Sequence, residues 1–147
     1  MRKLSMHLGE KLKLIIEADG GSRGNPGPAA YGCLVKNSDT NETLFKEGKT
    51  LGITTNNVAE YTGLVAGLTA AHRIDPNAEI EVRMDSKLVV EQMSGNWKIK
   101  HENMKDLVNK AQNAFPKEQV KYVWVPREEN LLADELLNIA LDAELNQ

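Results

Sequence analysis

The spacing of apolar residues changes near residue 57, and this change does most to limit the possible folds. Before it, runs rich in apolar and β-branched residues predict strands at 11–18, 30–37 and 42–51. After it, apolar residues between Asn57 and Arg73 recur every three or four positions, which is typical of an amphipathic helix. Three consecutive strands with short connections predict an antiparallel meander at the start of the chain.

The rest of the sequence alternates between strand and helix patterns. We predict strands at 78–84 and 119–125, and helices at 86–93, 102–115 and 131–145. A meander followed by strands that helices separate predicts an α/β fold, with a mixed sheet and helices on its faces. The 147 residues have the length of a single domain, 1–147, in which we expect residues 1–10 to be a flexible N-terminal segment.

Composition excludes several classes of protein. Cys33 is the sole cysteine, so an intramolecular disulfide and a thiolate metal site are both excluded. The sequence has no apolar stretch of the roughly 20 residues that cross a bilayer and no secretion signal, so we expect a cytoplasmic protein. We also expect a monomer, because no surplus apolar face is evident. The net charge of −3 argues against nucleic-acid binding unless several acids bind metal, since two divalent cations would change it to +1.

Four acidic residues fall at the predicted rim of the sheet. Asp19 ends the first predicted strand and Asp85 ends the fourth, while Glu60 and Asp134 lie in the first turns of two helices. If the two strands are parallel neighbours, their carboxyl ends meet at one edge, where ligands bind in α/β sheets. Taken singly, each acid is explained by a turn, a helix cap or a helix dipole. Their common location is what points to a site.

Clustered carboxylates indicate chemistry with divalent cations. Carboxylate oxygens are hard ligands that suit Mg²⁺ or Mn²⁺, and without cations they repel one another. Two ions roughly 3.5–4 Å apart can activate a water and stabilise the leaving oxygen of a phosphodiester. The sequence has no Walker A motif, no G-x-S-x-G and no H-E-x-x-H, so no rival catalytic set competes with this interpretation.

Four segments, spread in order over residues 12–142, carry a resemblance to a known family. DGGSRGNPGPAAYG resembles the first signature of type 1 ribonuclease H, and TTNNVAEYTGLVAGL resembles the second. MDSKLVVEQMSGNWK resembles the third and WVPREENLLADELLNIALD the fourth. The resemblance implies a five-stranded mixed sheet whose first three strands are antiparallel, in agreement with the strand pattern.

The resemblance also implies an activity. It makes Asp19, Glu60, Asp85 and Asp134 the catalytic residues and the ligands of two Mg²⁺ ions, with Mn²⁺ also accepted. The expected reaction is endonucleolytic hydrolysis of the RNA strand of RNA–DNA hybrids. It breaks the P–O3′ bond and leaves 5′-phosphate and 3′-hydroxyl ends. Other RNA-containing duplexes are further candidate substrates.

Substrate contacts are likewise implied by the resemblance. Asn25, Asn56 and Asn57 match residues that contact the minor groove of the hybrid, and Thr55 and Asn57 match positions that grip a DNA-strand phosphate. Turn-making and helix capping are the alternative roles for Asn25 and Asn56, and both kinds of role are compatible. The full set of expected substrate-binding residues is Gly20, Ser22, Asn25, Thr55, Asn56, Asn57, Ser86, Lys87 and Trp97.

Three departures from the family pattern affect these expectations. Members of the family often have a histidine in the loop before the last helix, where it is proposed to aid proton transfer or product release. The loop VPREENLLAD has no histidine, so Arg127, Glu128 or Glu129 takes over part of that role, or nothing does. Lys87 stands where a glutamine is common, which replaces a minor-groove contact with a possible phosphate contact. A basic helical protrusion is absent after Trp97, which makes this a compact form of the family. Trp97 either stacks on a deoxyribose or packs on the sheet.

The missing protrusion predicts weaker binding with a shallower salt dependence, and a reduced basic substitute remains at Lys98, Lys100, His101 and Lys105. Two rival functions stay open at this point. One is another nuclease of the same fold, such as a resolvase or exonuclease, and the other is a non-catalytic module that binds hybrids. Cleavage of plain DNA would favour the first, and hybrid binding without turnover would favour the second.

Overall fold

The computed structural model describes residues 11–146. Its strands are β1 (Lys13–Ser22), β2 (Gly27–Asn37), β3 (Thr43–Thr54), β4 (Glu79–Met84) and β5 (Val120–Trp124). Its helices are α1 (Asn56–Ile74), α2 (Lys87–Met93), α3 (Glu102–Ala114) and α4 (Leu131–Leu145), with short 3-10 turns at Lys117–Gln119 and Arg127–Glu129. This order confirms the predicted succession of strands and helices.

The strands form one five-stranded mixed sheet in the order β3-β2-β1-β4-β5. β1, β2 and β3 pair antiparallel, as adjacent strands joined by short connections do. β4 pairs parallel with β1, and β5 pairs parallel with β4, because a helical segment carries the chain back before each of them. The predicted five-stranded mixed sheet is therefore confirmed, and β1 lies at its centre.

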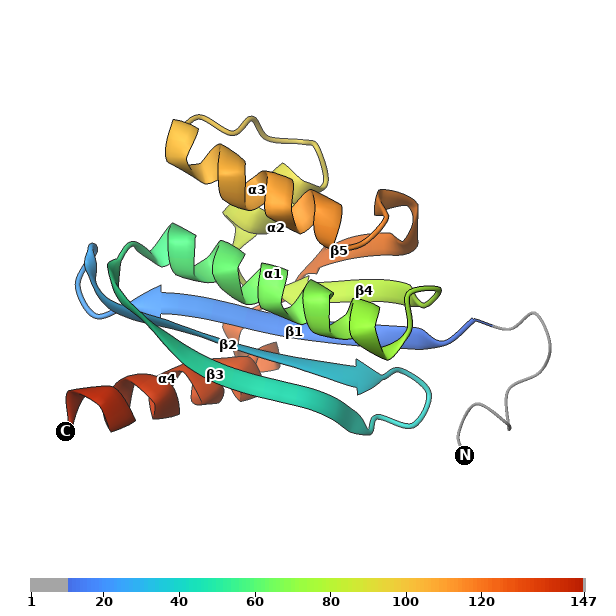
Figure 1. Cartoon of the computed structure of the whole chain (residues 1–147), viewed down its shortest axis with the longest axis horizontal. Helices are drawn as coiled ribbons and strands as arrows, with labels where there is room; N and C mark the ends of the chain where they lie inside the picture. Colours follow the sequence, from blue (N-terminus) through green and yellow to red (C-terminus); the bar gives the residue numbers. More distant parts are fainter. Residues whose placement is uncertain (1–10, 147) are drawn as a thin grey trace.

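Helices cover both faces of this sheet (Figure 1). α1 packs on β1 and β2 with α3 stacked against it, whereas α4 packs on β2, β3 and β1 from the other side. The alternation of side chains along β2 explains this arrangement. Tyr31 and Cys33 belong to the large core under α1, while Ala30 packs with Leu137 and Leu141 of α4. The expectation of helices on both faces is confirmed.

Glycines let both helices approach the sheet backbone directly. A Cβ atom on Gly32 would lie 2.1 Å from the carbonyl oxygen of Ala133, and one on Gly48 would lie 2.3 Å from that of Leu136. On the opposite face, a Cβ atom on Gly20 would lie 2.2 Å from the carbonyl carbon of Ala59 in α1. These contacts fix the height of α1 and α4 above the central strands.

Residues 19–30 are dense in Gly, Pro, Ser and Asn, a composition that predicts one long turn, but the segment is mostly strand. β1 continues to Ser22 and β2 begins at Gly27, so the irregular part is confined to residues 23–26, which contain a cis Asn25–Pro26 peptide bond. The interpretation that Asp19 ends its strand is wrong, because antiparallel pairing with β2 continues past Asp19. Asp19 nevertheless lies beyond the parallel pairing with β4, which stops at Glu17.

Other boundaries differ from the predictions by a few residues. β3 extends to Thr54, three residues beyond its predicted end, with a register shift opposite Gly52, whose φ is +74°. Ser86 is the N-cap of α2 instead of its first residue, since its side chain accepts a hydrogen bond from the Val89 amide. α4 spans residues 131–145, as predicted.

No helix within residues 11–146 is long and apolar enough to span a membrane. The predicted flexible segment 1–10 lies outside the described residues.

The glycine contacts generate a stability prediction. We expect Gly32→Ala to lower the free energy of unfolding by about 3 kcal/mol, because its Cβ must displace the α4 backbone. Gly21→Ala is the matched control, since a Cβ there would meet nothing closer than 3.9 Å. Urea unfolding of both variants measures the difference, and equal midpoints would contradict the close-packing explanation.

Candidate active site

The four acids expected from the sequence line one cavity of about 430 Å³. They reach it from four separate elements, because Asp19 lies in β1, Glu60 in α1, Asp85 just after β4 and Asp134 in α4. The structure therefore brings together residues that span more than a hundred positions of the sequence. Their full set of neighbours in the cavity wall is Gly20, Gly21, Ser22, Arg23, Asn56, Arg127, Leu137, Asn138 and Leu141.

Sheet register brings the two aspartates together. The parallel register joins Glu17 of β1 to Arg83 of β4, so advancing two residues along each strand brings Asp19 level with Asp85. Both side chains then point to the same face, because side chains alternate with a period of two. The hydrogen-bond register between β1 and β4 thus explains why two of the four acids, Asp19 and Asp85, lie together.

Helix contacts add the other two acids. Gly20 lies against the backbone of Ala59 and Glu60, so this part of α1 lies beside Asp19. Glu60 is in the second turn of α1 and not in the first turn, where the sequence predicted it, because the helix begins at Asn56. Gly32 is the β2 partner of Asp19, and it lies against the carbonyl oxygen of Ala133. The next residue in α4 is Asp134, which this contact holds near Asp19.

Bringing these acids together raises the pKa of two of them. Burial, together with the negative charges of Asp85 and Asp134, raises the pKa of Asp19 to about 8, although the Gly20 amide, 2.9 Å from Asp19 Oδ1, opposes the shift. Burial and the charges of Asp19 and Asp85 raise the pKa of Glu60 well above its usual value. One oxygen of Glu60, Oε2, is buried and has no hydrogen-bond partner within residues 11–146. A buried carboxylate oxygen without a partner is costly unless a proton or a cation satisfies it.

The open arrangement of the four acids fits divalent cations that take only some of their ligands from the protein. Among residues 11–146, no three acidic, histidine or cysteine side chains converge closely enough to form a ready-made metal cage. The carboxylates instead surround an open cavity. This suits Mg²⁺, which keeps several waters and binds through few carboxylates together with substrate phosphates. The unpartnered Glu60 oxygen and the hard oxygen donors are compatible with that ion.

Sequence reasoning missed Asn130. Its side chain is 1% exposed, and its Nδ2 donates to the Ala18 carbonyl and to Asp85 Oδ1, both at 2.9 Å. Asn130 precedes α4 and so has the sequence signature of a helix cap, yet its side chain makes no capping bond. It joins the middle of β1 to the acid that follows β4, and so orients Asp85. From the sequence, an asparagine just before a helix indicates an N-cap. The contact of Asn130 with Asp85 becomes visible only in the folded structure.

Of the three loop residues proposed to replace a histidine, Arg127 lines the cavity and Glu128 and Glu129 are not part of its wall. Arg127 Nε lies 3.9 Å from Asp85 Oδ2, and its side chain is 78% exposed. Its charge also opposes the rise in the pKa of Glu60. The guanidinium therefore stands at the mouth of the cavity, where it can reach an anion.

The expected minor-groove residues form a hydrogen-bonded unit between the β1–β2 turn and α1. Asn56 Oδ1 accepts from the Ser22 amide at 2.8 Å and from Ser22 Oγ at 3.0 Å. Asn25 Oδ1 accepts from the Asn56 amide at 3.0 Å. These bonds hold the turn to the start of α1, whose N-cap is Thr55, and no residue within 11–146 accepts a hydrogen bond from the Asn25 side-chain NH₂ group, which is available to a ligand.

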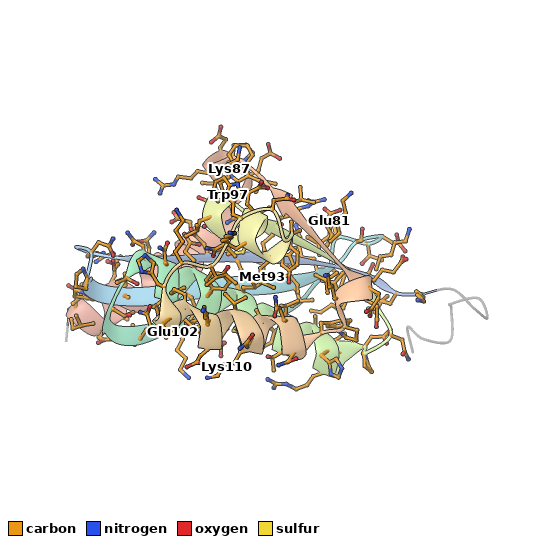
Figure 2. The ribbon with its side chains drawn as sticks, turned by 90° about the horizontal axis from the view of Figure 1, so that it is seen from above. Glu81, Lys87, Met93, Trp97, Glu102 and Lys110 are labelled. Carbon is orange, nitrogen blue, oxygen red and sulfur yellow. The ribbon has the colours of Figure 1, made fainter. Side chains whose placement is uncertain are left out.

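Two further expected contacts line a second hollow of about 630 Å³ beside α2. Asn57 and Trp97 line it together with the basic residues Lys98, Lys100 and His101. Trp97 is 45% exposed, which favours a binding role over packing on the sheet. Figure 2 shows Trp97 and Lys87 on the α2 side of the molecule, and Glu102 and Lys110 along α3.

Three expected contacts, Thr55, Ser86 and Lys87, line neither cavity, although each is next in sequence to a residue that lines one. Thr55 Oγ1 accepts from the Val58 amide at 3.3 Å and so caps α1, while Ser86 caps α2. Lys87 Nζ lies 5.9 Å from the centre of the Trp124 ring, within range of a cation–π contact. The Trp124 indole donates to the Asp85 carbonyl at 3.2 Å.

A glutamine holds one wall of the second hollow in place. Gln92 Oε1 accepts from the buried Tyr61 hydroxyl at 2.7 Å, and its Nε2 donates to the Lys98 carbonyl at 3.1 Å. Tyr61 follows Glu60 directly in α1. The segment that carries Trp97 and Lys98 is therefore bonded to the helix that carries one of the acids.

Comparison with known proteins agrees with this arrangement. A family model described as "Reverse transcriptase-like" matches residues 17–140. The Ribonuclease H of Hydrogenovibrio crunogenus is 34% identical over 139 residues, which cover 84% of this chain and 92% of that protein. The chain belongs to the type 1 ribonuclease H family of enzymes.

Two further family members are more similar in sequence. The Bifunctional protein Rv2228c of Mycobacterium tuberculosis is 52% identical over 133 residues, covering 90% of this ribonuclease H chain but only 36% of that protein. The chain thus spans about a third of the length of its mycobacterial relatives. A crystal structure of LC11-RNase H1 in complex with an RNA/DNA hybrid superposes with a TM-score of 0.83 at 41% identity, covering 90% of this chain and 99% of that one.

The raised pKa of Asp19 predicts how stability depends on pH in the metal-free protein. A carboxyl whose pKa is higher when folded binds more protons in the folded state, so its stabilising contribution is present below about pH 4 and lost as pH rises through about 8. We expect Asp19→Asn to be more stable than the parent by on the order of 3 kcal/mol at pH 9 in EDTA, and to lose this advantage near pH 4.

Chemical unfolding across this pH range measures the effect. Asp106→Asn is the matched control, because Asp106 is exposed on α3. If the stability difference between Asp19→Asn and the parent did not change with pH, burial of a charged Asp19 would not be the cause.

Proposed function

We propose that this protein hydrolyses the RNA strand of RNA–DNA hybrids as a two-metal endonuclease. The observation that carries the proposal is the convergence of four acids from four elements on one cavity, with a buried Glu60 oxygen that lacks a protein partner. A structural role does not explain an arrangement that costs the folded protein stability. Hybrid binding by a 41% identical relative supports the choice of substrate.

Asp19, Glu60, Asp85 and Asp134 would hold two divalent ions, Mg²⁺ or Mn²⁺. When bound, such ions supply an activated water and stabilise the leaving 3′ oxygen, so that the products carry 5′-phosphate and 3′-hydroxyl ends. Asn130 keeps Asp85 turned toward the cavity through its bond to Oδ1. Arg127 stabilises negative charge on the reacting phosphate from the mouth of the cavity.

Recognition of the RNA strand belongs to the turn beside Asp19. Asn25 and Asn56 are held by each other and by Ser22, so their amides are preorganised near the strand being cut. A 2′-hydroxyl both donates and accepts hydrogen bonds, and an amide group tests for it well. Gly20 allows the α1 backbone, and with it Glu60, to lie close to β1.

The DNA strand would occupy the second hollow. Thr55 and Asn57 at the start of α1, with Lys98 and Lys100, offer hydrogen bonds and positive charge to its phosphates. Trp97 offers an aromatic face to a deoxyribose. Ser86 and Lys87 lie at the start of α2, where they would contact the duplex next to Asp85. We further propose that the protein acts as a cytoplasmic monomer and accepts other RNA-containing duplexes less well.

A substrate panel tests the function. We expect Mg²⁺- or Mn²⁺-dependent cleavage of an RNA–DNA hybrid, at a rate well above that for duplex RNA and with no cleavage of duplex DNA. Gel analysis of strands labelled at each end also identifies the products, which should be 5′-phosphate and 3′-hydroxyl. Cleavage of plain DNA but not hybrid would favour a resolvase or exonuclease, and binding without turnover would favour a non-catalytic module.

Asp85→Asn tests the metal assignment. We expect it to fold normally and to lose activity by at least about a thousandfold, a loss of the size seen when a major electrostatic contact to the reacting group is removed. We also expect Mg²⁺ to raise the melting temperature of the parent and to have little effect on the variant. Glu79→Gln, at the exposed start of β4, is the matched control and should behave like the parent. Near-normal cleavage by purified Asp85→Asn would reject the assignment.

A further inference from the structure

Arg23 stands in the catalytic cavity, although neither the acidic set nor the expected substrate contacts include it. It begins the turn between β1 and β2, four residues after Asp19. Of the described residues that line the cavity, Arg23 and Arg127 are the cationic ones, among four acids. Arg127 lies beside Asp85, and Arg23 lies toward the C-terminal half of α4, so the two positive charges flank the acids from different elements.

In the protein alone, Arg23 is paired with α4. Its Nη2 lies 2.6 Å from Asp142 Oδ1 and 3.4 Å from Asn138 Oδ1. Both partners of the ion pair are open to solvent, with 42% of the Arg23 side chain and 59% of the Asp142 side chain exposed. An exposed ion pair contributes at most about 1 kcal/mol, so exchanging Asp142 for another anion costs little.

We propose that Arg23 exchanges Asp142 for a phosphate of the strand being cut, on the side of the scissile phosphate away from Arg127. The inference rests on the proposed nuclease function, since it needs a polynucleotide strand in the cavity. A guanidinium binds phosphate through two parallel hydrogen bonds and stays charged at all physiological pH values. Asp142 then acts as a competitor that occupies Arg23 until the strand arrives.

The surroundings of Arg23 favour this role. Its own amide donates to the Pro28 carbonyl at 2.9 Å, and the adjacent Ser22 is bonded to Asn56. The backbone under the guanidinium is therefore fixed to the same unit that carries Asn25, while the side chain remains exposed. The turn between β1 and β2 would thus present both the asparagine amides that recognise ribose and the Arg23 guanidinium that binds a neighbouring phosphate.

A latch is the competing explanation. In that case the Arg23–Asp142 pair would serve only to hold the turn against α4, and removing either partner would harm binding in the same way. Phosphate exchange predicts opposite effects, because Arg23 is the ligand and Asp142 its competitor. The sign of the Asp142 effect therefore separates the two.

The experiment compares Arg23→Gln and Asp142→Asn in the full chain. Steady-state cleavage of a hybrid oligonucleotide with Mg²⁺ gives KM and kcat, and fluorescence anisotropy in an Asp85→Asn background gives Kd between about 50 and 200 mM salt. We expect Arg23→Gln to raise KM and Kd about tenfold with a smaller change in kcat, and to lower the salt slope of log Kd by about one. We expect Asp142→Asn to lower KM and Kd two- to threefold, roughly the effect of freeing one competing exposed ion pair.

Charge-matched controls exclude a general electrostatic effect. Arg73→Gln removes a positive charge in the last turn of α1, about 20 Å along the helix from Glu60. Glu144→Gln removes a negative charge two residues beyond Asp142 in α4. Both should leave KM, Kd and the salt slope close to the parent values.

Each outcome decides between the explanations. Opposite shifts in Arg23→Gln and Asp142→Asn, both larger than in the controls, support phosphate exchange. Shifts in the same direction with lowered melting temperatures identify a latch and overturn the proposal, as do shifts no larger than the controls. If the parent neither binds nor cuts any hybrid, the proposed function itself fails and the role of Arg23 fails with it.

Discussion

Backbone contact between the central strands and two helices is the constraint on which the rest of the structure depends. Gly20 lies against α1 and Gly32 against α4, and these glycines flank Asp19 along β1 and across the β1–β2 pair. A larger residue at either position would separate a helix from the sheet. The same contacts that build the core therefore also bring Glu60 and Asp134 to Asp19, so fold and site cannot be varied independently.

The acidic cavity shows a conflict between stability and function. Asp19 and Glu60 are buried close to other negative charges, which raises the pKa of both and destabilises their charged forms. Such an arrangement persists when the surrounding structure over-determines it. Here that structure is the sheet register on one side and helix packing on the other. In the proposed function, cations and a phosphate backbone would supply the charges that the protein itself leaves unbalanced.

Periodicity was sufficient to predict the strands and α-helices of residues 11–146, though not the two short 3-10 turns, because long amphipathic patterns report which face is buried. It failed in residues 19–30, where glycine and proline suggested a turn but the backbone continues to pair on both sides of residues 23–26. The shared location of the acids was predictable from the expected sheet edge, although Asp19 lies within β1 and reaches that edge because the parallel pairing with β4 stops at Glu17. Asn130 and Arg23 were not predictable, since their partners, Asp85 and Asp142, lie 45 and 119 residues away.

The position of Asp134 in the last helix has a consequence for synthesis of the protein. Residues 13–85 contain β1, α1 and three of the acids, but α4 forms only when the chain has been made through about residue 145. Until α4 leaves the ribosome, one face of β1, β2 and β3 lacks its cover and the acidic set lacks a member. Under the proposed nuclease function, a nascent chain without α4 would hold three of the four acids and would not yet cut RNA.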